Sequence, residues 1–486
     1  MTEFKGLVPF FSTDPIDEAL SDLTVTVNKP RRAEDVMTFD APWEGNGTDF
    51  GSIVKEDGFY RFYYETWSDD NWYDPSAPFE IHVCYAESKD GINWVKPSLG
   101  LVELNGSTDN NVIIKSIPDN ITVMKDENPL CPPEMRYKAV MTLVETDYRD
   151  GNRANVLGLM VSEDGISFTL HSVISRGLAY DTQNTLHYDK ITGKYFCYIR
   201  AYEQRDPSAP ADPRFNEENV RTIRVIESRD LENWSEPRLL DFGDAEHYPL
   251  YTNCISKYPY DERYFIGFPT RYVERRDWSD SYESLCGREL RKKRMGVQKR
   301  LGLALSDCLF MSSTDGVHFH RFEEATLTSG AETGKNWVYG DCFPSVGQPI
   351  ITPSAVKGEP DELSIYVFGH HWMDVPSVLT RYVYRKDGFA SVKASYKGGR
   401  IVTKPFTLDS STLTLNMSTS ARGGIYVNVL DSEGNAIEGY SSCELFGDTL
   451  CKPVSFPSPL EALRGKSVRL EFVMKDAELY SMELGE

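Results

Sequence analysis

The chain has 486 residues and a formal net charge of −22. Such an acidic protein offers no broad positive field, which excludes a nucleic-acid partner, and no window of the sequence resembles a membrane span. At this length one hydrophobic core does not suffice, so we expect two domains or a repeat array with a partner domain. Aromatic residues make up 12% of the chain, and long apolar helical stretches are absent, which favours β structure.

The start of the chain and its cysteines bear on the cellular compartment. Met1-Thr2-Glu3-Phe4 does not begin a basic segment followed by an apolar run, so no secretory leader is expected. Nine cysteines without a CxxC pair indicate neither a disulfide framework nor a zinc site. We therefore expect a cytoplasmic protein with free thiols and without a cofactor.

A short segment recurs along the chain about every 70 residues. Its first copy reads Ser88-Lys89-Asp90-Gly91-Ile92-Asn93-Trp94, and further copies begin at Ser162, Ser228, Ser313 and, in a worn form, Arg385. Asp-Gly tolerates the positive φ of a tight turn, and the aspartate and serine side chains can hydrogen-bond the local backbone. The aromatic residue three positions after the glycine is predicted to pack back over the hairpin. Five such turns indicate a repeat architecture.

Strand-like runs precede these turns. They cover 51–54, 60–64 and 81–86 in the first unit, 137–141 and 157–161 in the second, 185–188, 195–199 and 222–226 in the third, 253–255, 264–268 and 303–305 in the fourth, and 364–368 and 380–384 in the fifth. About four short strands per unit, repeated five times, are typical of a five-bladed β-propeller. We expect the propeller over 41–391, after an irregular lead-in over 1–40 in which Val25-Thr26-Val27 forms a short strand that closes the ring.

After Gly388 the composition of the sequence changes. Short strands are predicted over 413–416, 424–430, 436–440 and 468–474, with a hairpin turn at Asp431-Ser432-Glu433-Gly434. These features predict a C-terminal β-sandwich over 392–486, close to the usual domain size. The predicted fold class is therefore all-β, a five-bladed β-propeller followed by a β-sandwich domain.

Two insertions interrupt the units. Residues 270–300 include the basic runs Arg275-Arg276 and Arg291-Lys292-Lys293-Arg294, and we predict a solvated helix or loop there. A substrate lid, or a contact between copies of the chain in a homo-oligomer, are the alternatives for this segment. Residues 203–219 form a second insertion, rich in proline and charge, near the third unit.

The chain resembles the invertase and arabinanase superfamily, which comprises glycoside hydrolase families 32, 43 and 68 and their relatives. The resemblance rests on segments 85–94, 181–184, 310–319, 387–389 and 476–481, and as an architecture it covers nearly the whole chain. The Asn-Asp-Pro-Asn opening motif and the Glu-Cys signature of invertases are missing. Arg205-Asp206-Pro207 spells an invertase tripeptide in a proline-rich loop, which we interpret as coincidence. The resemblance implies a carbohydrate substrate and leaves its identity open.

Glycoside hydrolysis needs two carboxyl groups, one protonated as the acid and the other ionised as the base or nucleophile. The resemblance implies acidic residues at the inner strands of the early blades. The predicted catalytic residues are therefore Asp49, Asp126 and Asp181, each before the predicted first strand of its blade, and Glu227, just before the third turn. By analogy Asp49 is expected to be the base or nucleophile and Asp181 the acid, with Glu227 in reserve. Asp126 is expected between them, where it would orient the site and tune pKa values.

Other polar and aromatic residues near predicted strand ends are expected to bind the sugar, because an aromatic face stacks on the apolar face of a sugar ring. The predicted substrate-binding residues are Trp43, Glu44, Gln183, Asn184, Arg200, His247, Asp341 and His370. Platform or packing roles are open for Trp67, Trp72, Trp337 and Trp372. The pair His370-His371 has no companion motif, so no metal site is predicted.

The leading hypothesis is a soluble glycoside hydrolase that cleaves a glycosidic bond in an oligosaccharide or small glycoside by paired-carboxylate acid/base catalysis. The first alternative is a phosphate-dependent glycoside phosphorylase, which cationic groups at the mouth of the propeller would favour. The second is a non-catalytic carbohydrate-binding propeller, which would lack convergent carboxylates. The stereochemical outcome depends on the separation of the carboxyl groups and stays open.

Overall fold

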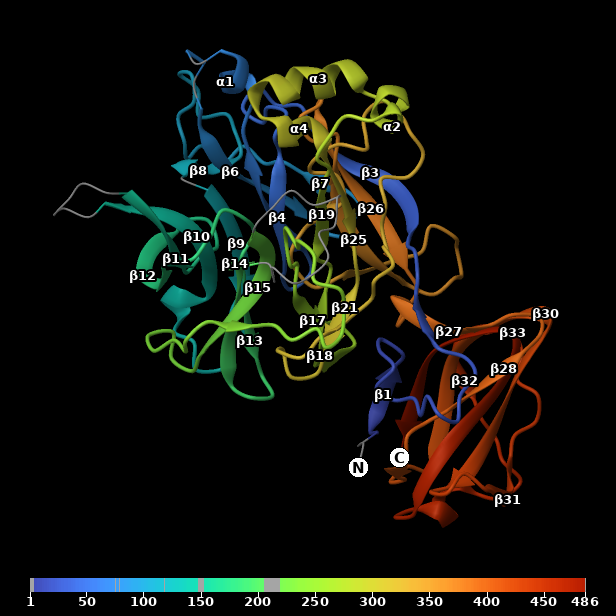
Figure 1. Cartoon of the computed structure of the whole chain (residues 1–486). Helices are drawn as coiled ribbons and strands as arrows, with labels where there is room; N and C mark the ends of the chain where they lie inside the picture. The colour runs from blue at the N-terminus through green and yellow to red at the C-terminus, as the bar shows by residue number, and fades with distance from the viewer. Residues whose placement is uncertain are drawn as a thin grey trace. The chain divides into compact units, whose positions relative to one another are not determined.

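The computed structural model describes residues 4–485 except 75, 78, 118, 147–152 and 205–218. Arg205-Asp206-Pro207 and most of the 203–219 insertion lie outside the described residues. The chain divides into a larger unit of Arg31–Pro353 and Leu363–Val383 and a smaller unit of Met1–Pro30, Ser354–Glu362 and Tyr384–Glu486 (Figure 1). Among the described residues, no helix is long and apolar enough to cross a membrane.

The larger unit contains five antiparallel sheets, each with a path of four strands. Blade one consists of β4 (Asp49–Lys55), β5 (Tyr60–Thr66), β6 (Ile81–Ser88) and β7 (Trp94–Val95), with β8 (Val112–Ile117) beside β6. Blade two has β9 (Asp119–Lys125), η1 (Pro133–Met135), β10 (Tyr137–Thr146), β11 (Arg153–Ser162) and β12 (Thr169–Arg176), and blade three has β13 (Thr185–Asp189), β14 (Lys194–Gln204), β15 (Asn219–Ser228) and β16 (Arg238–Leu239).

The remaining blades follow the same pattern. Blade four has β17 (Ser256–Tyr258), β18 (Asp261–Gly267), β21 (Met311–Ser313) and β22 (His320–Arg321), and blade five has β23 (Phe343–Pro344), β25 (Glu362–Gly369), β26 (Ser377–Tyr384) and β3 (Arg31–Phe39), with β24 (Ile350–Thr352) beside β25. The prediction of a five-bladed β-propeller is confirmed.

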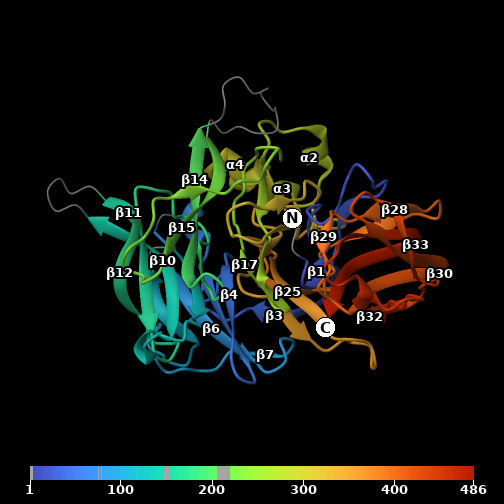
Figure 2. The ribbon, with the colours of Figure 1, turned by 90° about the horizontal axis from the view of Figure 1, so that it is seen from below.

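The first strands of the blades lie around a common axis. Strand β9 contacts β4 and β13, and β23 contacts β4. Figure 2 shows β4, β17 and β25 near the middle of this unit and β11 and β12 at its edge. The first strand of each blade runs along the axis in the same direction. The first residues of these strands therefore gather at one mouth of the propeller, and their last residues gather at the other.

The ring is closed by β3, whose Met37 and Phe39 pair with Leu379 and Ser377 of β26. The prediction that residues 25–27 close it is wrong, because β2 (Val25–Val27) pairs with β27 (Ala390–Ala394) in the smaller unit. Strand β3 is an outer edge strand with a largely exposed, charged sequence. Such edges carry charges that suppress pairing with other chains. Because of these charges, the sequence of β3 lacks the alternation of apolar and polar residues by which a strand is recognised.

The recurring turn has the predicted chemistry. In the first copy, Gly91 donates its backbone N–H to Ser88 Oγ at 2.9 Å, and Ile92 and Asn93 donate theirs to Asp90 Oδ1, each at 2.8 Å. The indole of Trp94 donates to the Gly91 carbonyl at 3.1 Å, which packs the ring back over the hairpin. The same serine and aspartate bonds recur in the turns of blades two, three and four.

These turns also join neighbouring blades. A buried tyrosine of the adjacent blade donates its hydroxyl to the carbonyl of the turn glycine in three places: Tyr366 to Gly91 at 2.6 Å, Tyr63 to Gly165 at 2.8 Å and Tyr198 to Gly316 at 3.0 Å. The repeated turn therefore holds one blade to the next as well as ending a hairpin.

We expect Gly91→Ala to destabilise the protein more than Gly58→Ala. Both glycines have a positive φ, but a Cβ at position 91 would lie 2.7 Å from the Tyr366 hydroxyl, whereas one at position 58 would meet nothing within 4 Å. Overpacking a buried contact costs about 1–3 kcal/mol, and this is the expected difference between the two variants in urea unfolding. Equal losses would show that the turn does not lock the blades together.

The worn fifth copy is not a blade turn. Strand β26 has β3 as its outer neighbour, so the chain leaves the propeller after it. Within the smaller unit, the Asp387 carboxylate accepts a hydrogen bond from the Ser481 hydroxyl at 2.6 Å, and the chain continues into β27. The fifth copy therefore marks the exit from the repeat.

The smaller unit is a nine-stranded antiparallel sheet. It comprises β1 (Gly6–Pro9), β2, β27, β28 (Gly399–Val402), β29 (Phe406–Thr407), β30 (Thr412–Asp431), β31 (Ala436–Ser441), β32 (Asp448–Pro453) and β33 (Ser467–Gly485), with η2 (Leu460–Leu463) before β33. The pairing of the long strands β30 and β33 shifts register between Thr419 and Gly424. Because hydrogen bonds join all nine strands, the two-layered sandwich stays a prediction, as do the domain boundaries at 40 and 391.

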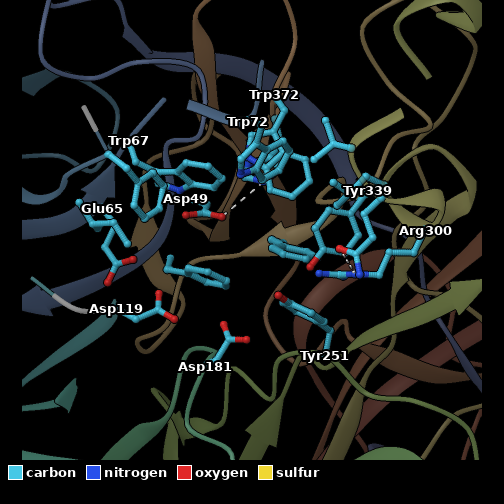
Figure 3. A pocket seen from close by; sticks show the side chains of 18 residues that line it. Asp49, Glu65, Trp67, Trp72, Asp119, Asp181, Tyr251, Arg300, Tyr339 and Trp372 are labelled. Atoms are coloured by element: carbon cyan, nitrogen blue, oxygen red, sulfur yellow. Dashed lines mark hydrogen bonds and ion pairs between the residues drawn. The ribbon is translucent and has the colours of Figure 1, made fainter. Parts of the chain in front are cut away.

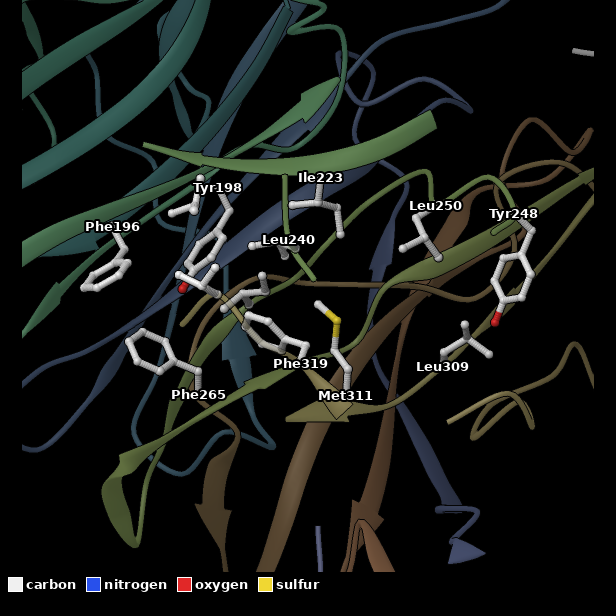
Figure 4. Close-up of a cluster of buried hydrophobic side chains, with 13 residues drawn as sticks. Phe196, Tyr198, Ile223, Leu240, Tyr248, Leu250, Phe265, Leu309, Met311 and Phe319 are labelled. Carbon is white, nitrogen blue, oxygen red and sulfur yellow. The ribbon is translucent and has the colours of Figure 1, made fainter. Parts of the chain in front are cut away.

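Apolar clusters between blades make the propeller rigid. One of them lies between blades three and four, where Phe196 and Tyr198 of β14 meet Phe265 of β18 and Met311 of β21 (Figure 4). Phe196 and Phe265 pack edge to face with ring centroids 5.3 Å apart. Such clusters hold the inner strands in fixed positions around the axis.

The 270–300 segment is helical, one of the two forms predicted for it. It forms β19 (Thr270–Glu274), α2 (Asp280–Ser284), α3 (Arg288–Val297) and α4 (Lys299–Leu303), and β20 (Ala304–Cys308) follows and pairs with β19. In Figure 1, α3 and α4 lie at the top of the propeller with α1 (Asp70–Tyr73). The segment is only partly solvated: Lys292 and Lys293 are exposed, whereas Arg291 and Arg294 are only 2% and 1% exposed. Arg291 donates to the Trp337 and Cys286 carbonyls, which satisfies its buried guanidinium.

Candidate active site

A cavity of about 370 Å³ opens at the mouth where the inner strands begin. Asp49 and Asp119 are the first residues of β4 and β9, and Asp181 comes shortly before β13. Val297 of α3 and Leu301 of α4 also line the cavity, so the helical insertion forms part of its wall. The full lining is Asp49, Phe50, Glu65, Trp67, Trp72, Phe79, Ile81, Asp119, Asp181, Tyr251, Val297, Gln298, Arg300, Leu301, Tyr339, Phe343, His371 and Trp372 (Figure 3).

Four carboxyl groups meet in this cavity, from Asp49, Glu65, Asp119 and Asp181. Asp49 on β4 is the cross-strand partner of Glu65 on β5. Burial raises the pKa of Asp119, and the nearby charge of Asp181 raises it further. The reason is that like charges at close range disfavour each other's ionised forms.

Burial separates the protonation states of these groups. Burial raises the pKa of Asp49 well above its usual value, and the negative charge of Asp119 raises it further. Burial also raises the pKa values of Glu65 and Asp119, with further increases from neighbouring carboxylates. By contrast, the side chain of Asp181 is 64% exposed, and the guanidinium of Arg200 lies 3.3 Å from its Oδ2. One cavity thus contains buried carboxyl groups with raised pKa values and one exposed carboxyl group next to a guanidinium.

His371 does not act as a counter-ion to Asp49. Its Nε2 lies 3.6 Å from Asp49 Oδ2, but burial lowers the pKa of this histidine to about 3, so the imidazole is neutral at neutral pH. The other oxygen of Asp49, Oδ1, is buried and has no hydrogen-bond partner among the described residues. A buried polar atom of this kind is usually satisfied by water or a ligand.

Aromatic rings form a second side of the cavity. The indoles of Trp67 and Trp72 have ring centroids 5.6 Å apart, and those of Trp72 and Trp372 4.7 Å apart. Tyr339 stacks on Trp372 with centroids 4.8 Å apart. Figure 3 shows this aromatic group beside the carboxyl groups. Acidic groups next to aromatic faces suit a ligand that has hydroxyl groups on its edges and apolar C–H faces.

Of the predicted site residues, Asp49 and Asp181 line the cavity, and Arg200 lies beside Asp181. Of the tryptophans whose role was left open, Trp67, Trp72 and Trp372 also line it. Trp337 does not line the cavity, and its indole donates to the Gly330 carbonyl at 2.8 Å.

Asp126 does not lie between Asp49 and Asp181 as predicted. Its carboxylate is buried in an ion pair with Lys138 and accepts a hydrogen bond from the Tyr195 hydroxyl at 2.7 Å. The sequence predicts residues 137–141 as the first strand of blade two, but β9 is the first strand and β10 the second. The position before the first strand therefore belongs to Asp119, and Asp126 follows the end of β9.

Glu227, Glu44 and Trp43 also lie outside the cavity lining. Glu227 pairs with Lys194 and Arg238 at 2.7 and 2.6 Å. Glu44 is fully buried in blade one, where it accepts hydrogen bonds from the Tyr64 hydroxyl and from Lys96, each at 2.7 Å. The indole of Trp43 donates to Asn111 Oδ1 at 2.9 Å. These contacts assign all three residues to the framework of blades one and three.

The remaining predicted binding residues are structural or peripheral. Gln183 donates to the Gly51 carbonyl at 2.7 Å, and Asn184 to the Tyr180 carbonyl at 2.9 Å. The buried carboxylate of Asp341 accepts from the Val338 N–H at 3.1 Å, and burial raises its pKa to about 6. His247 pairs with Glu203 at 3.1 Å, and His370 lies 3.3 Å from the Pro376 carbonyl.

Glu65, Asp119 and Arg300 are site residues that the sequence did not predict, whereas an orienting role was open for His371, which also lines the cavity. Glu65 had a readable signal, because it is a charged residue near the end of an otherwise apolar, aromatic strand. Arg300 had none, because its position depends on the fold of the insertion. Among the described residues, no group of three or more His, Cys, Asp or Glu side chains is arranged to hold a metal ion.

The raised pKa of Asp49 predicts how stability changes with pH. The folded protein retains a proton that the unfolded chain releases near pH 4, so this carboxyl group lowers stability progressively as the pH rises above about 4. Asp49→Asn removes this effect. We therefore expect the free energy of unfolding of the variant, relative to wild type, to increase from pH 5.5 to pH 8 in urea titrations. His371 is neutral in this range and does not contribute to the difference. A difference independent of pH would show that Asp49 has an ordinary pKa.

No protein-family model and no curated protein sequence matches this chain. Among solved structures, it is similar to an N-acetylgalactosamine deacetylase from F. plautii in complex with blood group B trisaccharide, at TM-score 0.44 and 12% identity over 92% of this chain and 95% of the other. It is also similar to the Bombyx mori family GH32 β-fructofuranosidase, at TM-score 0.41 and 10% identity over 95% of each chain.

A third similar structure comes from the GH130 family of mannoside phosphorylases, described as containing glycoside hydrolases that target β-1,2 mannosidic linkages in Candida mannan, at TM-score 0.40 and 13% identity over 79% of this chain and 97% of the other. At these identities none of the three shows which reaction this chain performs. The strand pairing itself defines a five-bladed β-propeller with a carboxyl-lined cavity at one mouth.

Proposed function

We propose that this chain is a glycoside hydrolase whose active site is the cavity at the start of the inner strands. The observation that supports this most is the contrast between Asp49 and Asp181, two carboxyl groups of one cavity in opposite environments. Glycosidases require one carboxyl group that is protonated and another that is ionised, and such pairs are recognised by environments that drive their pKa values apart. The aromatic rings beside them suit the apolar faces of a sugar.

In this proposal the roles of Asp49 and Asp181 are the reverse of those expected by analogy. Asp49 is buried, and burial raises its pKa well above the usual value, which favours the protonated form that can protonate the leaving-group oxygen. Asp181 is exposed at the same cavity and lies 3.3 Å from the Arg200 guanidinium, a position suited to the base or nucleophile. Asp119 lines the same cavity and would orient the site. This is the orienting role that was predicted for Asp126.

A phosphorylase is the second candidate, and Arg300 is the observation that favours it. This residue lines the same cavity. Its guanidinium lies 5.4 Å from the centroid of the Tyr339 ring, and its main electrostatic partners are the phenols of Tyr339 and Tyr272. Figure 3 shows it apart from the carboxyl groups. An arginine in this position could pair with inorganic phosphate as the attacking group.

A substrate screen tests both candidates. Purified protein would be incubated with nitrophenyl glycosides of the common pyranoses and furanoses and with neutral oligosaccharides, each with and without inorganic phosphate. Release of free sugar without phosphate supports the hydrolase, and sugar 1-phosphate formed only with phosphate supports the phosphorylase. Saturable binding of a saccharide without turnover under any condition would instead identify a non-catalytic carbohydrate-binding propeller.

A further inference from the structure

The propeller has a second cavity, also of about 370 Å³, at the opposite mouth of the axis. Its lining comes from the ends of the inner strands, whereas the first cavity is lined by their beginnings. Thr122 lies in the second half of β9, His187 in β13, and Ser256 begins the short β17. Val346 and Ile350 follow β23 in blade five. All five blades contribute, since residues 53–55 at the end of β4 complete the lining.

Hydrogen bonds that join the inner strand of blade one to blades two, three and five lie between the two cavities. The Gly51 carbonyl in β4 accepts from Gln183 Nε2 and from the Val346 N–H, each at 2.7 Å. One residue further along, Ser52 Oγ accepts from the Val123 N–H at 3.0 Å. Gln183 and Ser52 are fully buried. The second cavity is therefore not an extension of the active site.

Four buried polar atoms at this second cavity have no hydrogen-bond partner among the described residues. One of them, Lys257 Nζ, lies 2.7 Å from an Asp189 oxygen as an ion pair. The three uncharged atoms are Thr122 Oγ1, His187 Nε2 and Ser256 Oγ. Thr122 and Ser256 are only 2% and 1% exposed. A buried polar group left without a partner is unfavourable, because it has lost its hydrogen bonds to water. Three such groups from three different blades at one cavity indicate that something other than the protein satisfies them.

The chemistry of these atoms selects a neutral ligand with hydroxyl groups. The two hydroxyls can donate and accept, and burial lowers the pKa of His187 to about 4, so its imidazole is neutral. Two lysines of the lining are already paired: Lys257 with Asp189 at 2.7 Å and Lys125 with Glu56 at 2.6 Å. Lys55 and Asp57, which also line the cavity, are exposed and opposite in sign, so they add no net charge that would select an ion.

Apolar groups form the rest of the lining. Tyr60 and Tyr188 provide aromatic rings, and Val346, Pro349 and Ile350 provide aliphatic surface. The hydroxyl groups at the edge of a sugar ring can hydrogen-bond Thr122, His187 and Ser256, and its C–H faces can pack on the aromatic and aliphatic groups. A cavity of about 370 Å³ lies within the range of small-molecule sites, about 300–1,000 Å³.

We propose that the second cavity is a binding site for a neutral polyhydroxylated molecule of monosaccharide size, which hydrogen-bonds Thr122, His187 and Ser256. The site is independent of the proposed hydrolase activity, because the hydrogen-bonded layer at Gly51 separates it from Asp49 and Asp181.

Crystals of the wild-type protein soaked in D-glucose, D-galactose, D-mannose or D-fructose test the proposal. We expect density for one of these sugars in the second cavity, within hydrogen-bond distance of Ser256 Oγ and His187 Nε2. Ordered water alone at this position with all four sugars, or sugar density confined to the first cavity, would overturn the proposal. This measurement needs no variant and does not depend on turnover.

Calorimetry in solution provides the second test. We expect Thr122→Val and Ser256→Ala each to weaken binding of that sugar about three- to tenfold, as expected for the loss of one hydrogen bond. Thr169→Val, which removes an exposed hydroxyl from the outer strand of blade two, should leave the affinity unchanged, as should Asp49→Asn. Loss of binding in Asp49→Asn with full retention in Ser256→Ala would assign the sugar to the first cavity and contradict the proposal. Failure of the substrate screen leaves both measurements interpretable.

Discussion

Asp181→Asn is expected to lower kcat by about 10²–10⁴-fold on every substrate that the wild-type protein cleaves, as is usual when a catalytic base or acid is lost. The carboxylate of Asp181 lies at the cavity with Arg200 as its counter-ion at 3.3 Å. An amide at this position cannot accept a proton or attack the anomeric carbon. The loss should therefore not depend on the leaving group.

Asp49→Asn is expected to show a different pattern. On unactivated glycosides the loss should again be about 10²–10⁴-fold, because no acid protonates the departing oxygen. On dinitrophenyl glycosides, whose leaving group needs no proton, most of the wild-type rate should remain. The Asp49→Asn variant, assayed with these activated substrates, should also lack the alkaline limb that the pH profile of the wild-type protein shows. That limb reports the deprotonation of Asp49.

Asp109→Asn serves as the control, because Asp109 is exposed and lies outside the cavity lining. It should leave kcat unchanged. If the leaving-group dependence appears in Asp181→Asn and not in Asp49→Asn, the roles are those expected by analogy with the arabinanase-like enzymes, and the assignment from burial is wrong. If neither variant loses activity, these residues are not catalytic.

Lys138→Met is expected to cost about 3–5 kcal/mol in the free energy of unfolding, the usual effect of removing one member of a buried ion pair. The side chains of Lys138 and Asp126 are both fully buried. Without the lysine, the Asp126 carboxylate keeps only its neutral partners, which include the Tyr195 hydroxyl at 2.7 Å. Urea unfolding measures the loss.

Lys115→Met is the matched control, because Lys115 is exposed, and it should change stability little. The kcat of the folded Lys138→Met protein should stay close to that of wild type, because Asp126 lies away from the cavity lining. A large loss of kcat with little loss of stability would contradict this and restore Asp126 to the catalytic residues.

The repeated turn could be predicted because its chemistry is local. Ser88 and Asp90 hydrogen-bond backbone groups within three residues of themselves, so the sequence contains the whole interaction. Four copies keep the serine and the aspartate, the third with Leu231 in place of glycine, and together with the worn fifth copy they predicted five blades. The position of Asp49 and Asp181 before the first strands of their blades followed from the same count.

Strand β9 shows where this reasoning failed. It follows blade one closely, and residues 119–125 lack a turn of their own that would set it apart. The count in blade two was therefore wrong by one strand, and Asp126 was chosen in place of Asp119. The closure of the ring by β3 was missed for a related reason, because its partner β26 lies more than 300 residues away and its exposed face is charged.

Local sequence thus determined the turns, the blades and the two acidic residues that stand at strand starts. Only the tertiary structure decided that Glu65 and Asp119 join them, and that α3 and α4 form part of the cavity wall. It also decided that the pKa of Asp49 is raised. The physical reason is that a pKa depends on burial and on charges brought close in space, and Asp49 is enclosed by residues from the blades and the insertion.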